Sequence, residues 1–185
     1  MTPLRVLFVC TANICRSSTA ELMARAAVPE GTDLVFESAG THGYTDAPVE
    51  AVMATALPDG LDLTAFRSRP LTTELLTSAD LVLTMEAAHR DFILRDHPSL
   101  FRKVLTLGQF AAAVESAPRG LDRAALIAHV GVSRGPADPA LDVRDPYGRG
   151  PEAASGCVAH LDELLQTVLP ALSADAPGKG RTWTT

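Results

Sequence analysis

The chain has 185 residues, which is enough for one domain with a full hydrophobic core. Hydrophobic residues make up 46% of it and charged residues 21%, as is usual for a globular protein, and the net charge of −6 disfavours non-specific binding of nucleic acid. No apolar stretch approaches the roughly 20 residues of a membrane-spanning helix, and no signal peptide or disulfide framework is recognisable, so we expect a cytoplasmic protein with no membrane partner.

The hydrophobic pattern alternates between strands and helices along the chain. Strands are predicted at residues 4–9, 34–38, 81–85 and 104–107. Helices are predicted at residues 16–26, 48–57, 71–78, 86–95, 110–114 and 121–130, with a last helix from 151 to about 170. This alternation predicts an α/β fold in which a four-stranded parallel sheet is flanked by helices on both faces. We expect one domain over residues 1–172, followed by a Pro/Gly-rich tail at 173–185 that frays.

The first predicted strand ends at Cys10 and the first predicted helix begins at Arg16, so a short loop joins them. Unpaired backbone N–H groups of such a loop converge on one point with the positive end of the helix dipole, and together they favour an anion. Arg16 can donate two parallel hydrogen bonds to two oxygens of a phosphate. The same field favours the thiolate form of Cys10, which places a nucleophile beneath a bound phosphoryl group. We interpret the stretch as a phosphate-binding loop rather than a structural cysteine beside a capped helix.

Polar residues around this loop have predicted supporting roles. The Ser17 hydroxyl could steady the sulfur of Cys10, and Asn13 tolerates the left-handed backbone that a concave loop requires. The spacing of Ser18 and Glu21 predicts a capping box at the start of the helix.

The loop resembles the signature C-x-G-N-x-C-R-S-P of the low-molecular-weight protein tyrosine phosphatase family at Cys10, Asn13, Cys15, Arg16 and Ser17. This chain has Ala12 where the family usually has Gly, and Ser18 where it usually has Pro. Four further stretches look like family landmarks in the family's order, at residues 38–41, 68–72, 79–85 and 145–148. Residues 108–142 are longer than in typical members, and we interpret them as an insertion near the rim of the active site.

The resemblance implies hydrolysis of phosphotyrosine in proteins through a cysteinyl-phosphate intermediate, without a cofactor. Cys10 is then the nucleophile, and Arg16 binds phosphate together with the loop. The implied substrate-binding residues of the loop are Thr11, Ala12, Asn13, Ile14, Cys15 and Ser17.

The reaction also needs an acid that protonates the leaving oxygen and a base that activates water. Asp145, in the sequence Asp-Pro-Tyr, is a weak signal alone, but the resemblance places the family's general acid at this position. Asp142 is the alternative. The family has aromatic walls for a flat substrate ring at the positions of Tyr44 and Tyr147, and the less favoured alternative is that both are surface tyrosines in turns.

The other cysteines and the histidines carry less specific signals. Cys15 is either a small apolar filler or, as the resemblance favours, a resolving thiol that pairs with oxidised Cys10. Cys157 is expected in the core, and His89 is expected to face solvent or to pack between helices. None of the histidines has metal-ligand spacing to another His or Cys, so we predict no metal.

Three other functions are weighed against a tyrosine phosphatase. Arsenate reductases on this fold need two further cysteines after the third strand, and this chain has none there. Protein-arginine phosphatases carry Thr at the position of Ile14, whose bulk should crowd a guanidino-phosphate. A non-catalytic phosphate-binding module is expected to have lost the nucleophile, the arginine or the acid, yet Cys10, Arg16 and Asp145 are all present.

Overall fold

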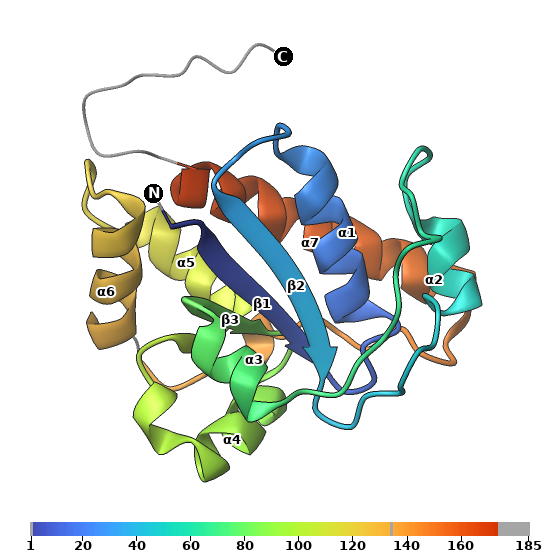
Figure 1. The fold of residues 1–185 in the computed structure, drawn as a ribbon, viewed down its shortest axis with the longest axis horizontal. Coiled ribbons are helices and arrows are strands. Elements are labelled where there is room, and N and C mark those ends of the chain that lie inside the picture. Colours follow the sequence, from blue (N-terminus) through green and yellow to red (C-terminus); the bar gives the residue numbers. More distant parts are fainter. Residues whose placement is uncertain (1, 134, 174–185) are drawn as a thin grey trace.

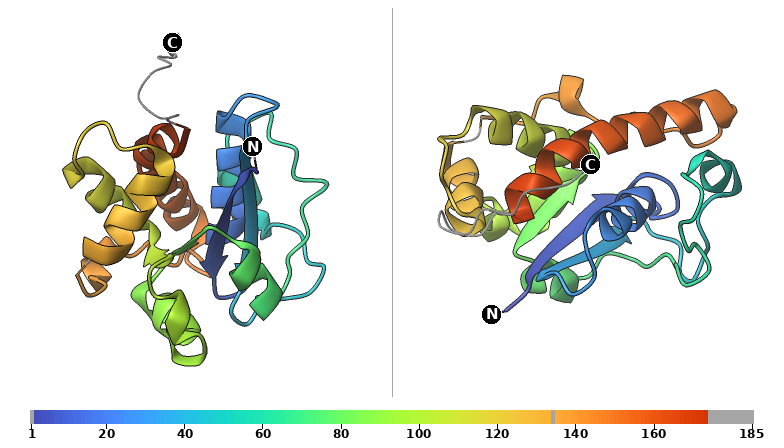
Figure 2. Two further views of the ribbon diagram at one scale, coloured as in Figure 1. Left: turned by 60° about the vertical axis from the view of Figure 1, so that its left-hand side comes forward. Right: turned by 90° about the horizontal axis from the view of Figure 1, so that it is seen from above.

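The computed structural model describes residues 2–133 and 135–173, in which four parallel strands form one sheet with the order β2–β1–β3–β4. The strands are β1 (Leu4–Cys10), β2 (Leu34–Gly40), β3 (Leu81–Thr84) and β4 (Val104–Thr106). The α-helices are α1 (Arg16–Ala27), α2 (Ala51–Ala56), α3 (Thr73–Ser78), α4 (Ala87–Asp96), α5 (Leu107–Ser116), α6 (Arg123–Ser133) and α7 (Gly150–Ser173). Two short 3₁₀ helices are η1 (Pro98–Leu100) and η2 (Pro139–Leu141). Helices lie on both faces of the sheet, so the predicted fold class is confirmed (Figures 1 and 2).

Alternate residues of β1 face opposite sides of the sheet and so divide the core in two. Val6 and Phe8 belong to the larger cluster, which α1, α2, α5, α6 and α7 cover. Leu7 and Val9 belong to a smaller cluster beneath α3 and α4. Because β1 is buried on both faces, its sequence is a continuous apolar run, as is typical of an interior parallel strand.

Two helices have ends that differ from the prediction. The helix expected from residue 48 begins only at Ala51, because the Glu50 side chain accepts a hydrogen bond from the backbone N–H of Met53 (3.0 Å) and caps it there. The last helix was expected to end near Pro170, but α7 continues to Ser173. Leu172 is fully buried, so packing of the final turn outweighs the hydrogen bond that Pro170 cannot make.

The start of α1 at Arg16 agrees with the prediction, but the predicted capping box of Ser18 and Glu21 is wrong. The Ser18 hydroxyl donates to the carbonyl of Cys15 (2.9 Å), and the Glu21 carboxylate accepts from Ser38 on β2. No side chain caps the first turn of α1. Its free N–H groups are therefore left for another acceptor.

The segment 108–142 contains most of α5, all of α6, and η2. Phe110 of α5 and Leu126 and Val130 of α6 join the larger core cluster, so these helices contribute to the same core as α1 and α7. The assignment of residues 108–142 as an insertion stays a prediction. The predicted tail at 173–185 lies almost wholly outside the described residues. In the part of the chain that the structure describes, no helix has the length and apolar character needed to cross a membrane.

Candidate active site

The loop between β1 and α1 lies at the carboxyl end of the parallel sheet, where open α/β folds usually bind ligands. Backbone hydrogen bonds from Thr41 to the carbonyl of Cys10 and from His42 to the carbonyl of Thr11, both 2.9 Å, fix the loop against the end of β2. Gly40 makes this close approach possible. A Cβ atom at Gly40 would lie 2.5 Å from the carbonyl oxygen of Thr11.

The sulfur of Cys10 is buried beneath this loop and has two polar neighbours. The Ser17 hydroxyl lies 2.9 Å from Sγ, and the backbone N–H of Asn13 donates to Sγ at 3.3 Å. Asn13 has a φ of 58°, the left-handed conformation expected from the sequence, and this conformation turns its N–H toward the sulfur. A thiolate cannot donate, so a thiolate at Cys10 accepts from both the Ser17 hydroxyl and the N–H of Asn13, which stabilise its negative charge.

Arg16 is 2% exposed, and hydrogen-bond acceptors from three other residues surround its guanidinium. Its Nη1 forms an ion pair with Glu86 and donates to the carbonyl of Val143 (3.0 Å), while its Nη2 lies 3.2 Å from Oδ2 of Asp145. Burial alone would lower the pKa of Arg16, but the negative charges of Cys10 and Glu86 raise it, so the guanidinium stays charged.

The Nε atom of Arg16 is buried and has no hydrogen-bond partner among the described residues. A buried donor left without a partner is costly, and an anion beside the loop would provide one. Nε and Nη2 form one edge of the guanidinium, which matches two oxygens of a phosphate.

Asp145 reaches this site from the loop before α7, and its side chain is 44% exposed. Its Oδ1 accepts a hydrogen bond from the backbone N–H of Tyr147 (3.3 Å). Asp142, the alternative acid, instead accepts from the N–H of Ala87 (2.8 Å) at the start of α4. Burial raises the pKa of Asp142. The structure therefore places Asp145, and not Asp142, in contact with Arg16.

The two predicted aromatic walls are exposed, Tyr44 by 56% and Tyr147 by 59%. The backbone N–H of Tyr44 donates to the carbonyl of Ala12 (3.3 Å), which ties one tyrosine to the loop, and Tyr147 follows Asp145 closely. Their proposed contact with a substrate ring stays a prediction.

Ile14 and Cys15, the other predicted substrate-binding residues, are buried in the larger core cluster. Burial raises the pKa of the Cys15 thiol to about 12. Cys157 is also buried, and the same cause raises its pKa to about 12.

Glu86 and His89 also belong to the site, although neither was predicted there, and His89 faces the loop rather than solvent as one of its expected places had it. Glu86 precedes α4 and pairs with Arg16, and His89 on the first turns of α4 makes a 2.8 Å hydrogen bond between Nε2 and the hydroxyl of Thr11. His89 is 5% exposed, and burial, followed by the charge of Arg16, lowers its pKa to about 4. Glu86 is extended and lies outside α4, so no helical spacing in the sequence indicated that these two side chains belong together.

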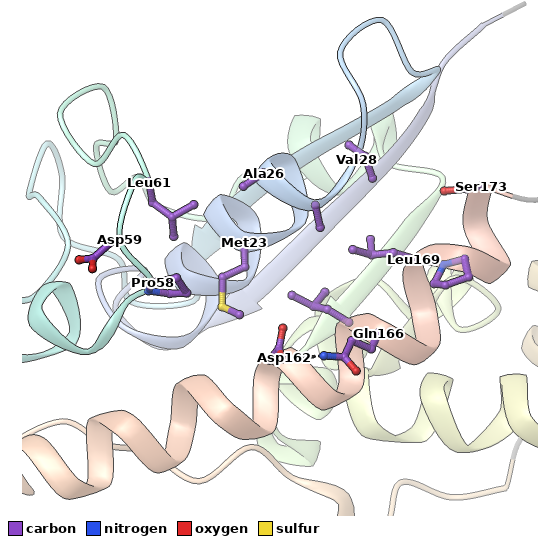
Figure 3. Close-up of a pocket in the computed structure, with 13 residues that line it drawn as sticks. Met23, Ala26, Val28, Pro58, Asp59, Leu61, Asp162, Gln166, Leu169 and Ser173 are labelled. Carbon is purple, nitrogen blue, oxygen red and sulfur yellow. Dashed lines mark hydrogen bonds between the residues drawn. The ribbon is translucent and has the colours of Figure 1, made fainter. Parts of the chain in front are cut away.

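A cavity of about 670 Å³ lies elsewhere, between α1, α7 and the loop that follows α2 (Figure 3). Met23, Leu61, Leu165 and Leu169 make much of its lining apolar, and none of the predicted site residues lines it. Within the described ranges, no group of three His, Cys, Asp or Glu side chains could hold a metal ion.

Comparison with known proteins gives concordant matches. Residues 5–123 match the family model described as low molecular weight phosphotyrosine protein phosphatase. The low molecular weight protein-tyrosine-phosphatase Etp of Escherichia coli is 35% identical over 106 residues, covering 57% of this chain and 70% of Etp. The protein-arginine-phosphatase of Bacillus subtilis is 29% identical over 171 residues, covering 92% of this chain and 97% of that protein. The crystal structure of a low molecular weight protein tyrosine phosphatase from T. tengcongensis superposes with a TM-score of 0.71 at 29% identity, covering 90% of this chain and 98% of that one.

Proposed function

Because the chain belongs to the low molecular weight phosphotyrosine protein phosphatase family, whose members are hydrolases, we propose that it hydrolyses phosphotyrosine in proteins through a phosphocysteine on Cys10. The observation that carries the proposal is the pairing of two groups at one loop. The sulfur of Cys10 contacts the N–H of Asn13 and the hydroxyl of Ser17, and the buried Nε of Arg16 has no hydrogen-bond partner among the described residues. A phosphate bound there satisfies Arg16 and lies in reach of the nucleophile.

In the first step the thiolate of Cys10 attacks phosphorus. The S–P bond forms while the bond from phosphorus to the tyrosyl oxygen breaks, and Asp145 donates a proton to that oxygen. Arg16 and the N–H groups of the loop and of the uncapped first turn of α1 bind the phosphoryl oxygens as charge develops on them.

In the second step water attacks the phosphocysteine. Asp145, now a carboxylate, takes a proton from the water, and the S–P bond breaks to release phosphate and the Cys10 thiolate. Hydrogen bonds to Sγ from Ser17 and Asn13 stabilise the thiolate as a leaving group. We also propose a cytoplasmic location, because Cys10, Cys15 and Cys157 are free thiols and this chemistry needs a reducing compartment.

Substrate choice follows in this proposal from the residues beside the loop. Exposed rings at Tyr44 and Tyr147 would form the walls of a slot for a flat phenyl ring. A seryl or threonyl phosphate is too short to place its phosphorus above Cys10 while its peptide stays outside such walls.

Phosphoarginine is the second candidate substrate, because the protein-arginine-phosphatase of Bacillus subtilis aligns with 92% of this chain. Against it stands Ile14, whose bulk in the loop should crowd a guanidino group and which offers no hydroxyl.

The two candidates are separated by kcat/KM on one peptide sequence carrying phosphotyrosine, phosphoserine, phosphothreonine or phosphoarginine. We expect phosphotyrosine to be preferred by a wide margin, with no turnover by the Cys10→Ser protein. Ile14→Thr should raise turnover of phosphoarginine. Equal rates on phosphoserine and phosphotyrosine would overturn the slot, and a preference for phosphoarginine in the unaltered protein would establish the second candidate.

A further inference from the structure

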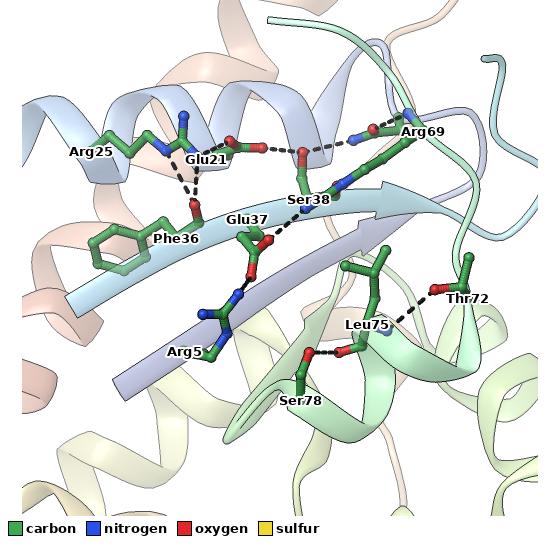
Figure 4. A network of polar contacts seen from close by, with 11 residues as sticks. Arg5, Glu21, Arg25, Phe36, Glu37, Ser38, Arg69, Thr72, Leu75 and Ser78 are labelled. Carbon is green, nitrogen blue, oxygen red and sulfur yellow. Dashed lines mark hydrogen bonds and ion pairs between the residues drawn. The ribbon is translucent and has the colours of Figure 1, made fainter. Parts of the chain in front are cut away.

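Glu21 is a buried carboxylate that the proposed reaction does not use. It lies on α1, is 6% exposed, and faces Ser38 of β2, with Arg25 and Arg69 beside it (Figure 4). Oε2 accepts from the Ser38 hydroxyl at 2.5 Å, and Oε1 lies 2.7 Å from Nη2 of Arg25.

The same serine connects Glu21 to the nucleophile. Nδ2 of Asn13 donates to the hydroxyl oxygens of both Ser38 (2.8 Å) and Ser17 (3.0 Å), and Ser17 in turn lies 2.9 Å from the sulfur of Cys10. We call these five residues, Glu21, Ser38, Asn13, Ser17 and Cys10, the Asn13 network. Every member is at least nine-tenths buried, so water does not compete for these bonds.

The carboxylate of Glu21, at one end of the Asn13 network, determines the directions of the other hydrogen bonds. An ionised carboxylate cannot donate, so the Ser38 hydroxyl must donate to Glu21 and can offer Asn13 only a lone pair. The group of Asn13 that faces Ser38 is therefore NH₂. Because that NH₂ also donates to Ser17, the hydroxyl hydrogen of Ser17 is left for the sulfur of Cys10 at 2.9 Å or the carbonyl of Ala39 at 3.5 Å, and the contact with the sulfur is the shorter.

The opposite orientation of the Asn13 amide would allow a competing hydrogen bond from Ser17. With the oxygen of Asn13 toward the two serines, Ser17 could donate to that oxygen instead of to the sulfur. The backbone N–H of Arg69, which donates to Oδ1 of Asn13 at 2.9 Å, opposes this flip from the other side. Glu21 and the N–H of Arg69 thus favour the same orientation from two different elements.

We propose that Glu21 is a positioning residue of the phosphate loop, which acts through Ser38 and Asn13 to direct the Ser17 hydroxyl onto the Cys10 thiolate. The proposal rests on the proposed function, since it assigns Glu21 to the same nucleophile. Glu21 itself touches neither the sulfur nor the phosphate pocket.

The ion pair with Arg25, in which Nη2 lies 2.7 Å from Oε1, favours the ionised form of Glu21. Burial raises the pKa of Glu21, with a smaller contribution from the neighbouring charge of Glu37, whereas the Ser38 hydroxyl, Arg25 and Arg69 lower it. The carboxylate is therefore paired on one side by Arg25 and held on the other by a hydroxyl.

The test compares Glu21→Ala and Glu21→Gln with Glu163→Gln, which alters an exposed carboxylate of α7 as a control. The first readout is the pH midpoint of Cys10 alkylation by iodoacetamide, followed by mass spectrometry, which needs no turnover. We expect Glu21→Ala to raise this midpoint by about one pH unit, because a hydrogen bond to the thiolate is weakened. Glu21→Gln should recover part of the shift, since its amide oxygen can still accept from Ser38, and the control should not move.

Turnover provides the second readout. Glu21→Ala should lower kcat on an aryl phosphate about tenfold and change KM less than threefold, because the loss is on the sulfur and not on phosphate binding. If the proposed function is wrong, the unaltered protein should turn over no phosphoester. Glu21→Ala should then still raise the pH midpoint of Cys10 alkylation.

A double-mutant cycle shows whether Glu21 acts through Ser38. Ser38→Ala should raise the alkylation midpoint in the same direction, and the double variant should show little further change. Ser38→Ala also serves where Glu21→Ala does not fold by circular dichroism. Additive shifts, or an unmoved midpoint in a folded Glu21→Ala protein, would overturn the proposal.

Discussion

Arg16 lies between two carboxylates that differ in exposure, and the difference suits different tasks. The side chain of Glu86 is 27% exposed and pairs with Nη1, on the opposite edge of the guanidinium from the unpartnered Nε. The side chain of Asp145 is 44% exposed and contacts Nη2, which a phosphate oxygen would take over. We therefore expect Glu86 to keep holding Arg16 when phosphate binds, while Asp145 is released toward the leaving oxygen.

Asp145→Asn tests the role of this released carboxylate. It should slow the first step on phosphotyrosine by about 10²- to 10⁴-fold, because the leaving oxygen then departs unprotonated. An aryl phosphate with a very acidic phenol needs little protonation of its leaving oxygen. The rate of its burst of phenol release should therefore fall far less. Asp142→Asn is the matched control, since Asp142 caps α4, and it should leave the ratio between the two substrates unchanged. Equal losses on both substrates would show that Asp145 is not the acid.

Oxidation tests the role of Cys15, which is buried close to the nucleophile in the chain. Mild peroxide converts the Cys10 thiolate to a sulfenic acid, and attack by the Cys15 sulfur would form a disulfide and release water. Inactivation should then be reversed by added thiol. Cys15→Ser should make it irreversible as the sulfenic acid oxidises further, whereas Cys157→Ser should behave like the unaltered protein. A peroxide-treated protein without a Cys10–Cys15 disulfide by mass spectrometry would limit Cys15 to packing.

Residues differ in how far the sequence could predict their roles. Cys10, Asn13, Arg16 and Ser17 lie in one short motif, so their grouping is already local in the sequence. Glu86 and His89 reach the loop only because β3 pairs with β1 and α4 follows β3. No local pattern encodes that approach, and their contacts with Arg16 and Thr11 could not be predicted from the sequence.

Several helices of this protein have a side-chain cap at their start, whereas α1, which begins at the site, has none. The Thr72, Thr106 and Glu50 side chains each accept from a backbone N–H of the helix that follows, whereas the start of α1 has no side-chain cap. The predicted capping box at Ser18 failed because Glu21 has stronger partners in Ser38 and Arg25. A propensity rule for one helix could not include these residues from β2 and from the next turn.

Thr106→Ala measures how much such a cap stabilises the fold. The Thr106 hydroxyl accepts from the N–H of Gln109 (3.0 Å) at the buried start of α5, so its loss should lower the free energy of unfolding by about 1–2 kcal/mol in urea. Thr72→Ala removes the corresponding cap of α3 (3.2 Å), where the side chain is exposed and water can replace it. The Thr72 variant should lose less, and equal losses would mean that burial does not strengthen the Thr106 cap.

At the scale of the whole molecule, the sequence predicted the layers but not the order of the strands. Apolar runs buried on both faces indicated a parallel sheet, yet nothing in β1 determines that β2 and β3 are its two neighbours. Packing also outweighed the local signal at the end of α7, where Leu172 is buried beyond Pro170. The site depends on this order, because the β1–α1 loop meets the end of β2 on one side and α4 on the other.

The contact of His89 on α4 with Thr11 of the β1–α1 loop should make the stability of the whole protein depend on pH. The folded-state pKa of His89 is about 4, below the value of 6.5 for a free histidine, because burial and Arg16 disfavour its charged form. Between pH 6.5 and 4 the unfolded chain therefore binds a proton at His89 that the folded chain does not. The free energy of unfolding should fall as pH is lowered through this range, and the part due to His89 should reach about 2 kcal/mol between pH 7 and 5.

Urea unfolding at pH 7 and pH 5 measures this contribution when His89→Gln is compared with the unaltered protein. Glutamine cannot take up the proton but can still hydrogen bond to the Thr11 hydroxyl, so the variant should lose less stability on acidification. Glu21 and Asp142, whose pKa values are raised in the folded state, shift stability in the opposite direction, and they do so equally in both proteins. His129→Gln, at an exposed position of α6, should retain the full pH dependence. If His89→Gln lost as much stability as the unaltered protein between the two pH values, His89 would not be held neutral beside Thr11.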